Sequence, residues 1–408
     1  MICGLLGRKL SHSYSPQIHR ELGDYPYLLW EKEPEEVENF IKNGEFDCLN
    51  VTIPYKKTVL PYCDTLSPAA VRLGAVNTIV RKKDGTLIGH NTDFFGFTAM
   101  VQRSGLNLNG KKALVLGTGG AASTAVAVLE EFGARVVSIS RSGENNYTNL
   151  HLHADATLIV NATPVGMYPD NGVAPVCVND FPQLEGVLDM IYNPACTKLL
   201  MDAKQKGLVT VNGLLMLVAQ AKESAEWFTG TAISNDVIPQ IENKLKREME
   251  NIILIGMPGS GKTTVGKLLA EKTGRAFVDT DTVIAEKAGC SIPEIFRTKG
   301  EAAFRALETQ VLSDICKESG LVIATGGGCV TRPENYPLLH QNGKTFCLQR
   351  TLDKLSVEGR PLSQNADLAA MYKIRKPLYQ QFAYIHIDNN DSAEAAADSI
   401  LKNWEEWP

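Results

Sequence analysis

The residues best suited to chemistry gather in two glycine-rich loops, each between an apolar run and a helical pattern. The first loop reads Gly117-Thr-Gly119-Gly120-Ala121, and the second reads Gly256-Met-Pro-Gly259-Ser260-Gly261-Lys262-Thr263-Thr264. The backbone N–H groups of such loops, with the N-terminus of the following helix, bind phosphate oxygens. The first spacing suits the pyrophosphate of a dinucleotide, and the second suits the triphosphate of ATP or GTP. Together they predict a redox step joined to phosphoryl transfer.

The second loop is the more specific of the two and also predicts a metal site. Lys262 is expected to reach the β and γ phosphate oxygens, and the hydroxyl of Thr263 to ligate Mg²⁺. The apolar run 321–325 leads into glycines, so it offers no aspartate that would help to hold the metal. Asp279 and Asp281, which follow another apolar run, can fill that place.

Three arginines beyond this loop are candidate anion clamps, namely Arg305, Arg360 and Arg375. A planar guanidinium suits both carboxylate and phosphate. Arg305 has an alternative, because at helical spacing it can pair with Glu301 or Glu308 on an exposed helix face.

The residues at the end of the strand after the first loop indicate which dinucleotide is bound. An NAD site would place a carboxylate there for the ribose hydroxyls. This chain has Arg141 between Ser140 and Ser142, and such a cation fits the 2′-phosphate of NADP. Glu144 lies close by and leaves NAD as the alternative.

The elements that must position these loops alternate between strand and helix. We expect strands at 2–6, 27–30, 48–53, 114–116, 135–139, 158–160, 187–191 and 208–211, and helices at 92–104, 121–132, 214–228 and 236–249. Asp84-Gly85 predicts a hairpin turn, and Ser15-Pro16 predicts an N-cap followed by proline at the first helical position. The alternation from residue 111 onward is typical of a doubly wound parallel sheet, and we place a domain boundary near Glu250.

Length and composition predict two or three globular domains and exclude several partners. The chain has 408 residues, of which 44% are hydrophobic and 21% charged, as is ordinary for globular proteins. A net charge of −5 without a long basic run argues against a nucleic-acid partner. The uncharged run 113–129 contains a glycine turn and is too short to span a membrane. Nine scattered cysteines and no signal peptide predict reduced thiols in a cytoplasm.

Several motifs stand in order over residues 1–245. They are Ser11-His-Ser13-Tyr-Ser15-Pro16, Asn50-Val-Thr52-Ile-Pro-Tyr-Lys56, Gly74-Ala-Val-Asn77-Thr, Asn91-Thr-Asp93, Asn161-Ala-Thr163-Pro-Val-Gly166-Met167, Asp189-Met-Ile-Tyr192-Asn-Pro and Met216-Leu-Val-Ala-Gln220-Ala. In this order they resemble the shikimate dehydrogenase family. The resemblance implies a two-lobed α/β enzyme, with a substrate lobe at about 1–100, a Rossmann-type NADP lobe at 101–212 and closing helices at 213–245.

The same resemblance implies roles for individual residues. Lys56 and Asp93 would form the catalytic pair, in which the lysine ammonium protonates the oxygen of a ring ketone while hydride reaches its carbon. The substrate would be held by Ser13, Ser15, Thr52, Asn77, Asp93, Tyr192 and Gln220. NADP(H) would be held by Gly117, Gly119, Gly120, Ala121, Arg141, Thr163 and Gly213. Without their neighbours, Ser15 would be interpreted as a plain N-cap, Lys56 as a surface lysine and Asp93 as a helix N-terminal acid.

A second set of motifs begins at residue 250. It consists of the phosphate loop, Asp279-Thr-Asp281, Gly300-Glu-Ala-Ala-Phe-Arg305-Ala-Leu-Glu308, Gly326-Gly327-Gly328, Arg360-Pro-Leu and Arg375-Lys-Pro-Leu-Tyr379. These motifs resemble shikimate kinase over residues 250–405, and imply a P-loop α/β domain with a central parallel sheet at 250–408.

The resemblance to shikimate kinase also implies roles. ATP would be held by the loop from Gly256 to Thr264, and shikimate by Asp281, Arg305, Gly327, Gly328 and Arg375. Asp281 would be the base for the substrate hydroxyl, and Asp279 would help to place Mg²⁺. Arg360 would close over the phosphates from a mobile lid that starts at Thr351 and is shorter than in many relatives.

The two resemblances fit one another, because the product of the first reaction is the substrate of the second. The chain is therefore expected to reduce 3-dehydroshikimate with NADPH and to phosphorylate shikimate with MgATP, in aromatic amino-acid synthesis. The alternatives are an NAD-linked quinate or shikimate dehydrogenase, a nucleoside monophosphate kinase, and a half that only senses its ligand. Intact Lys56, Asp93, Lys262 and Asp281 favour catalysis in both halves.

Overall fold

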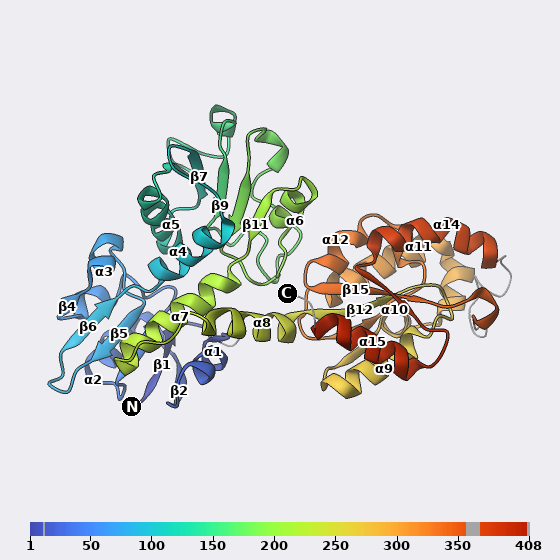
Figure 1. The fold of residues 1–408 in the computed structure, drawn as a ribbon, viewed down its shortest axis with the longest axis horizontal. Helices are drawn as coiled ribbons and strands as arrows, with labels where there is room; N and C mark the ends of the chain where they lie inside the picture. The colour runs from blue at the N-terminus through green and yellow to red at the C-terminus, as the bar shows by residue number, and fades with distance from the viewer. Residues whose placement is uncertain (11–12, 356–367, 406–408) are drawn as a thin grey trace. The chain divides into compact units, whose positions relative to one another are not determined.

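The computed structural model describes residues 1–10, 13–355 and 368–405, and the chain divides into two compact units (Figure 1). Unit 1 comprises Met1–Met167, Val173–Tyr192 and Leu199–Lys244. Unit 2 comprises Tyr168–Gly172, Asn193–Lys198 and Leu245–Pro408. Each unit is an α/β structure, as the alternation of strand and helix predicts.

Unit 1 begins with a mixed sheet. Its strands are β1 (Cys3–Gly7), β2 (Tyr27–Glu31), β3 (Cys48–Val51), β4 (Thr65–Leu66), β5 (Thr78–Arg81) and β6 (Leu87–His90), in the order β2-β1-β3-β5-β6-β4. Helices α1 (Ser15–Leu22), α2 (Pro34–Asn43) and α3 (Pro68–Leu73) connect these strands. Strands β5 and β6 form the predicted antiparallel hairpin, in which Gly85 adopts the left-handed φ of 89° that the turn requires.

Two sequence predictions in this region are wrong in detail. The cap position of α1 is Tyr14 and not Ser15, which is the first helical residue, and the Ser15 amide donates to the Ser13 hydroxyl at 3.2 Å. Strand β3 ends at Val51 instead of residue 53, because the chain turns at Thr52 and the proline at 54 has no N–H for the ladder.

The second sheet of unit 1 is the predicted parallel sheet. Its strands are β7 (Lys112–Leu116), β8 (Arg135–Ile139), β9 (Leu158–Asn161), β10 (Gly186–Asp189) and β11 (Val209–Val211), in the order β11-β10-β9-β7-β8. The helices of this part of the chain are α4 (Asp93–Ser104), α5 (Gly120–Glu131), α6 (Lys198–Gln205), α7 (Leu214–Thr229) and α8 (Val237–Met249). Of these, Lys198 of α6 and the end of α8 from Leu245 onward belong to unit 2. The uncharged run 113–129 becomes β7, the first glycine loop and α5. In the part of the chain that the structure describes, no helix is long and apolar enough to cross a membrane.

A glycine lets helices α4 and α7 approach closely. A Cβ on Gly96 would lie 2.7 Å from the carbonyl oxygen of Met216 and 3.0 Å from Cβ of Gln220. A larger residue would therefore push the two helices apart. Because α4 starts at Asp93 and α7 carries Gln220, this contact sets the distance between two candidate site residues.

Unit 2 is built on a parallel sheet of its own. The strands are β12 (Asn251–Ile255), β13 (Phe277–Asp279), β14 (Val322–Ala324), β15 (Gly343–Gln349) and β16 (Ile385–Asp388), in the order β13-β14-β12-β15-β16. The helices are α9 (Lys262–Thr273), α10 (Thr280–Ala288), α11 (Ile292–Ile315), α12 (Asn335–His340), α14 (Leu368–Phe382) and α15 (Ala393–Glu405).

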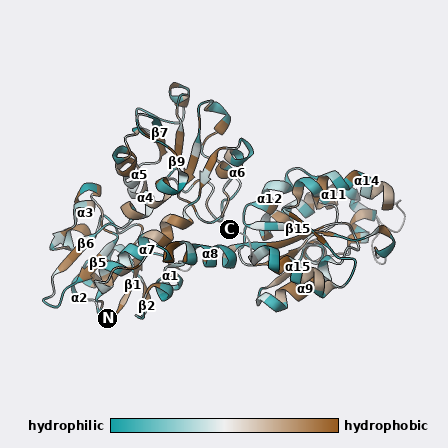
Figure 2. Cartoon of the chain, viewed as in Figure 1, coloured by the Kyte–Doolittle hydropathy of each residue, from teal (hydrophilic) through white to brown (hydrophobic). Residues whose placement is uncertain are grey.

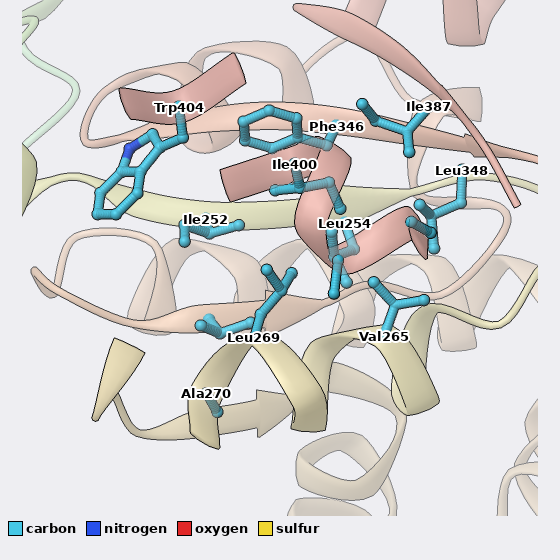
Figure 3. Close-up of a cluster of buried hydrophobic side chains, with 13 residues drawn as sticks. Ile252, Leu254, Val265, Leu269, Ala270, Phe346, Leu348, Ile387, Ile400 and Trp404 are labelled. Atoms are coloured by element: carbon cyan, nitrogen blue, oxygen red, sulfur yellow. The ribbon is translucent and has the colours of Figure 1, made fainter. Parts of the chain in front are cut away.

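One hydrophobic cluster of unit 2 lies between this sheet and helices α9 and α15, and a second packs the sheet against α11, α12 and α14. Ile252 and Phe346 from the two central strands meet Leu269 of α9 and Ile400 of α15, and all four are fully buried (Figure 3). The apolar colouring follows the strands, while the helices present mixed faces (Figure 2). Such near-continuous apolar strands are expected where helices cover both faces of a parallel sheet.

Because the imidazole of His19 is buried, we expect the fold of unit 1 to lose stability as the pH falls. His19 is 1% exposed, stacks on Tyr27 with ring centroids 4.0 Å apart, and has its pKa lowered to about 3 by burial. An unfolded histidine titrates near ~6.5, so between that pH and the folded pKa the unfolded state binds a proton that the folded state excludes. The free energy of unfolding is therefore expected to fall by about 2 kcal/mol from this residue alone between pH 7 and pH 5.

Urea denaturation at the two pH values measures this loss. His19→Gln is expected to flatten the pH dependence, whereas His151→Gln, at an exposed position, should leave it unchanged. Equal pH dependence in the wild type and His19→Gln would contradict the assignment.

Candidate active sites

A lysine–aspartate pair lies at the centre of the site in unit 1. Lys56 Nζ donates to Asp93 Oδ2 at 2.7 Å. Asp93 is the first residue of α4 and its side chain is 9% exposed, while the Lys56 side chain is 24% exposed. The pair is therefore partly desolvated, which strengthens the interaction, but the amine still reaches the open side of the site.

Side chains from two further elements fix this aspartate. Asn77, at the start of β5, donates to Asp93 Oδ1 at 3.0 Å and accepts from the Thr92 amide at 2.8 Å. Gln220 on α7 accepts from the Thr92 hydroxyl at 3.3 Å and lies 3.5 Å from Asn77 Nδ2. The structure thus brings Lys56, Asp93, Asn77 and Gln220, all predicted from the sequence, into one hydrogen-bonded group.

A buried polar network beneath this group is not among the predicted site residues. Ser224 accepts from Asn50 Nδ2 at 2.9 Å and is bonded to the hydroxyls of Thr78 and Thr92 at 2.9 and 3.1 Å. All four side chains are at most 6% exposed. Ser224 lies one helical turn after Gln220, so helical spacing is the signal that would have pointed to it.

Four other predicted substrate residues lie after strands or at the start of a helix. Thr52 follows β3, and its amide donates to the Leu6 carbonyl at 2.9 Å. Ser13 and Ser15 lie at the start of α1, and Tyr192 follows β10 with its ring edge-on to Tyr14 at 6.1 Å. Their roles stay predictions, and Ser11 and His12 lie outside the described residues.

A cavity of about 930 Å³ opens beside this pair, and its lining includes Lys56. The predicted cofactor residues that line it are Gly117, Gly119, Gly120, Ala121, Arg141 and Thr163. Gly117 has a φ of 114°, and a Cβ there would lie 3.1 Å from the Ala162 carbonyl oxygen, so the loop needs glycine at this position. The loop and the start of α5 at Gly120 fit a pyrophosphate, and Arg141 fits a further phosphate.

The cavity lining differs from the predicted set of cofactor residues at two positions. Gly213 is not among the residues that line this cavity; it precedes α7 and lies against the backbone of Met190. Tyr147, which no sequence motif indicates, does line the cavity, and burial raises the pKa of its hydroxyl.

The site in unit 2 is a cavity of about 390 Å³ around the second glycine loop. Helix α9 begins at Lys262, after Gly261 with a φ of 92°. Lys262 Nζ donates to the carbonyl oxygens of Gly256 and Met257, both at 2.9 Å. The lysine is thus folded back over the loop, where phosphate oxygens fit. Gly259, Thr263 and Thr264 also line the cavity, whereas Ser260 is fully buried.

The two predicted aspartates lie opposite this loop. Asp279 ends β13 and caps α10, because its Oδ1 accepts from the Asp281 amide at 3.0 Å, while its Oδ2 accepts from the Thr263 hydroxyl at 2.8 Å. A hydroxyl and a carboxylate in contact are hard oxygen donors of the kind that Mg²⁺ prefers. Among the described residues there is no group of three or more His, Cys, Asp or Glu side chains that could hold a metal.

The predicted anion clamps gather on the other side of the cavity. Arg305 is 8% exposed and pairs with Glu308 at 2.7 Å and with Glu301 at 3.3 Å. Both alternative partners are thus present: Glu308 is buried and lines the cavity, whereas Glu301 is exposed. Burial raises the pKa of Glu308, against the opposing effect of Arg305. Arg375 Nη1 donates to the Gly327 carbonyl at 3.1 Å.

A glycine leaves space for the guanidinium of Arg305. A Cβ on Gly328 would collide with the Arg305 guanidinium, so this glycine is needed for the close approach. Arg360 lies outside the described residues, as does the second half of the lid predicted at 351–360. Arg350, which the sequence motifs do not indicate, lines the cavity as well.

Comparisons with known proteins divide the chain in the same way. Residues 5–79 match the family model described as the shikimate dehydrogenase substrate binding domain, and residues 258–405 match the one described as shikimate kinase.

Individual relatives extend these matches. The chain is 36% identical over 267 residues to a shikimate dehydrogenase (NADP(+)) of Clostridium perfringens strain 13, covering 60% of this chain and 97% of that one. It is 43% identical over 185 residues to a shikimate kinase of Synechococcus sp. strain CC9605, covering 43% of this chain and 92% of that one. The crystal structure of shikimate dehydrogenase 1 from Peptoclostridium difficile superposes with a TM-score of 0.56 at 36% identity, covering 60% of this chain and 97% of that one.

Proposed function

The chain belongs to the shikimate dehydrogenase family through its N-terminal part and to the shikimate kinase family through its C-terminal part. On this premise we propose that residues 1–245 reduce 3-dehydroshikimate to shikimate and that residues 250–408 phosphorylate shikimate to shikimate 3-phosphate. One observation carries this proposal for both halves: the chain holds two separate glycine-rich loops, and each borders a cavity that a proposed catalytic residue also lines, Lys56 in the first and Asp281 in the second.

In the dehydrogenase, Lys56 donates the proton and Asp93 orients Lys56. Bound NADPH supplies the hydride. As negative charge builds on the ketone oxygen, the Lys56 ammonium stabilises it and donates a proton from Nζ. Asp93, held by Asn77 and the helix start, keeps this amine oriented. Thr52, Asn77 and Gln220 hold ring hydroxyls, and Ser13 and Ser15 hold the carboxylate.

Arg141 is expected to give the dehydrogenase its preference for NADPH. Replacing it with alanine should raise KM for NADPH far more than for NADH, because only NADPH carries the 2′-phosphate. A lost charge-assisted hydrogen bond is worth about 1.5–3 kcal/mol, which is roughly 10- to 100-fold in KM. Steady-state kinetics with both cofactors measure the ratio.

A matched control is Arg135→Ala, at an exposed position on β8, which should change neither KM. Equal effects of Arg141→Ala on both cofactors would show that this residue does not read the 2′-phosphate, and would favour the NAD-linked alternative.

In the kinase, the loop and the arginines hold the reactants while Asp281 takes the proton. ATP with Mg²⁺ supplies the phosphoryl group when bound. Lys262 and the loop amides hold its phosphates, and Thr263 with Asp279 holds the metal. Arg305 and Arg375 hold the shikimate carboxylate. Asp281 accepts the proton of the reacting hydroxyl as phosphate is transferred.

A coupled assay tests the whole proposal. The full chain is incubated with 3-dehydroshikimate, NADPH and MgATP, while NADPH loss and the phosphorylated product are followed together. Loss of NADPH without phosphorylated product would mean that the kinase half binds its ligand but does not catalyse phosphorylation. Phosphorylation of added shikimate without NADPH oxidation would mean that the dehydrogenase half binds its ligand but does not catalyse reduction.

A further inference from the structure

Arg350 enters the kinase cavity from the strand beside the phosphate loop. It directly follows β15, and it lines the same cavity as Lys262, Asp281 and Arg375. Strand β15 pairs with β12, and a Cβ on Gly256 at the start of the loop would lie 2.6 Å from the carbonyl oxygen of Leu348. Arg350 is only two residues farther along the chain, so its backbone is held close to the phosphate-binding amides.

Among the residues that the structure describes, no carboxylate balances the charge of Arg350. Arg305 has the carboxylates of Glu308 and Glu301, and Arg375 donates to the Gly327 carbonyl. Nε of Arg350 is buried and donates no hydrogen bond, and the guanidinium forms no ion pair with any residue that the structure describes. An unsatisfied cationic donor beside a cavity is unfavourable unless an anion arrives to accept from it.

We propose that Arg350 binds the γ-phosphate of ATP in the kinase site. The inference rests on the proposed function of unit 2 and adds a residue to it. The γ-phosphate is the anion that must lie between the loop and Asp281, because it passes from the nucleotide to the substrate hydroxyl. A guanidinium there holds its equatorial oxygens during transfer.

Binding experiments on the full chain test this role without turnover. Arg350→Met removes the charge but keeps the apolar stem. It is expected to weaken binding of the magnesium complex of AMP-PNP, an ATP analogue that is not hydrolysed, by about 10- to 100-fold. Binding of MgADP, which lacks the γ-phosphate, should change by less than about threefold, well below the effect of one charge-assisted bond. Isothermal titration calorimetry measures both.

Two further variants complete the test. Arg332→Met removes an arginine that pairs with Glu334 away from this cavity and should leave both affinities unchanged. Arg350→Lys should recover part of the affinity for MgAMP-PNP, because it restores the charge but not the planar fork. Equal weakening for MgADP and MgAMP-PNP, no weakening for either, or weakening of shikimate binding instead would overturn the inference. A wild-type chain that binds no MgAMP-PNP would contradict the proposed kinase function itself.

Thermal stability without ligand separates this role from a structural one. Since Arg350 has no ion-pair partner in the described part of the chain, the ligand-free melting temperature of Arg350→Met should equal or exceed that of the wild type. A clear decrease would mean that Arg350 supports the fold and would contradict the proposal. Ketone reduction by the same variant should be unchanged, which checks that unit 1 is folded.

Discussion

Alanine in place of Lys56 is expected to remove most of the ketone reduction and to leave shikimate phosphorylation intact. Loss of a positioned general acid typically costs ~10²- to 10⁴-fold in rate. Lys56 is well placed for this task, because its amine is fixed 2.7 Å from a nearly buried carboxylate and lines the cavity beside the first glycine loop. The rate of NADPH oxidation with 3-dehydroshikimate measures the loss, and phosphorylation of added shikimate by the same sample reports on folding.

Two companion variants sharpen the result. Lys83→Ala, on the exposed hairpin turn, should change neither reaction. Lys56→Arg keeps the positive charge but cannot release a proton near neutral pH, so it should stay impaired. Near-normal reduction by Lys56→Ala would refute the catalytic assignment, and full activity of Lys56→Arg would mean that charge alone is needed.

The parts of the sites that follow from sequence are those fixed by local chain geometry. A glycine loop between a strand and a helix places its amides by itself, so Gly117 to Ala121 and Gly256 to Thr264 could be assigned before the fold was known. Asp279 and Asp281 follow the same logic, because the end of a parallel strand opens at the ligand edge of the sheet.

The parts that do not follow are those that depend on packing between distant segments. Ser224 is linked to Asn50 and Thr78 only because α7 packs over the first sheet. Arg350 is an isolated arginine at a strand end, and nothing in the neighbouring sequence indicates that it lines a cavity or that its Nε has no hydrogen-bond partner. The shift of the α1 cap from Ser15 to Tyr14 is smaller, and reflects a backbone angle that composition does not determine.

The paired carboxylates of Arg305 show why a structural explanation and a functional one need not exclude each other. Helical spacing alone favours an exposed pair with Glu301 or Glu308. In the fold Glu301 stays exposed, whereas Glu308 is fully buried beside the cavity. The carboxylate therefore fixes the guanidinium in place, and the remaining N–H groups of Arg305 can be directed to an anionic ligand.

Alanine in place of Lys262 should stop phosphoryl transfer while ketone reduction continues, so that shikimate accumulates from 3-dehydroshikimate. The Lys262 amine lies over the carbonyl oxygens of the loop itself, and in the proposed reaction it is one of the cations that neutralise charge on the transferred phosphate. Removal of such a preorganised donor typically costs ~10²- to 10³-fold or more in rate. Chromatography of the coupled reaction, with NADPH oxidation recorded in parallel, measures both outcomes in one sample.

The matched control lies on the same helix. Lys267 is exposed on α9, and Lys267→Ala should leave both reactions unchanged, because it removes a lysine from the helix without touching the loop. Each half has its own phosphate loop and its own cavity. The Lys262→Ala chain should therefore oxidise NADPH at the wild-type initial rate, measured before shikimate accumulates. A fall in ketone reduction by Lys262→Ala but not by Lys267→Ala would mean that the kinase site acts on the dehydrogenase, and the two reactions would then have to be treated as coupled within one chain.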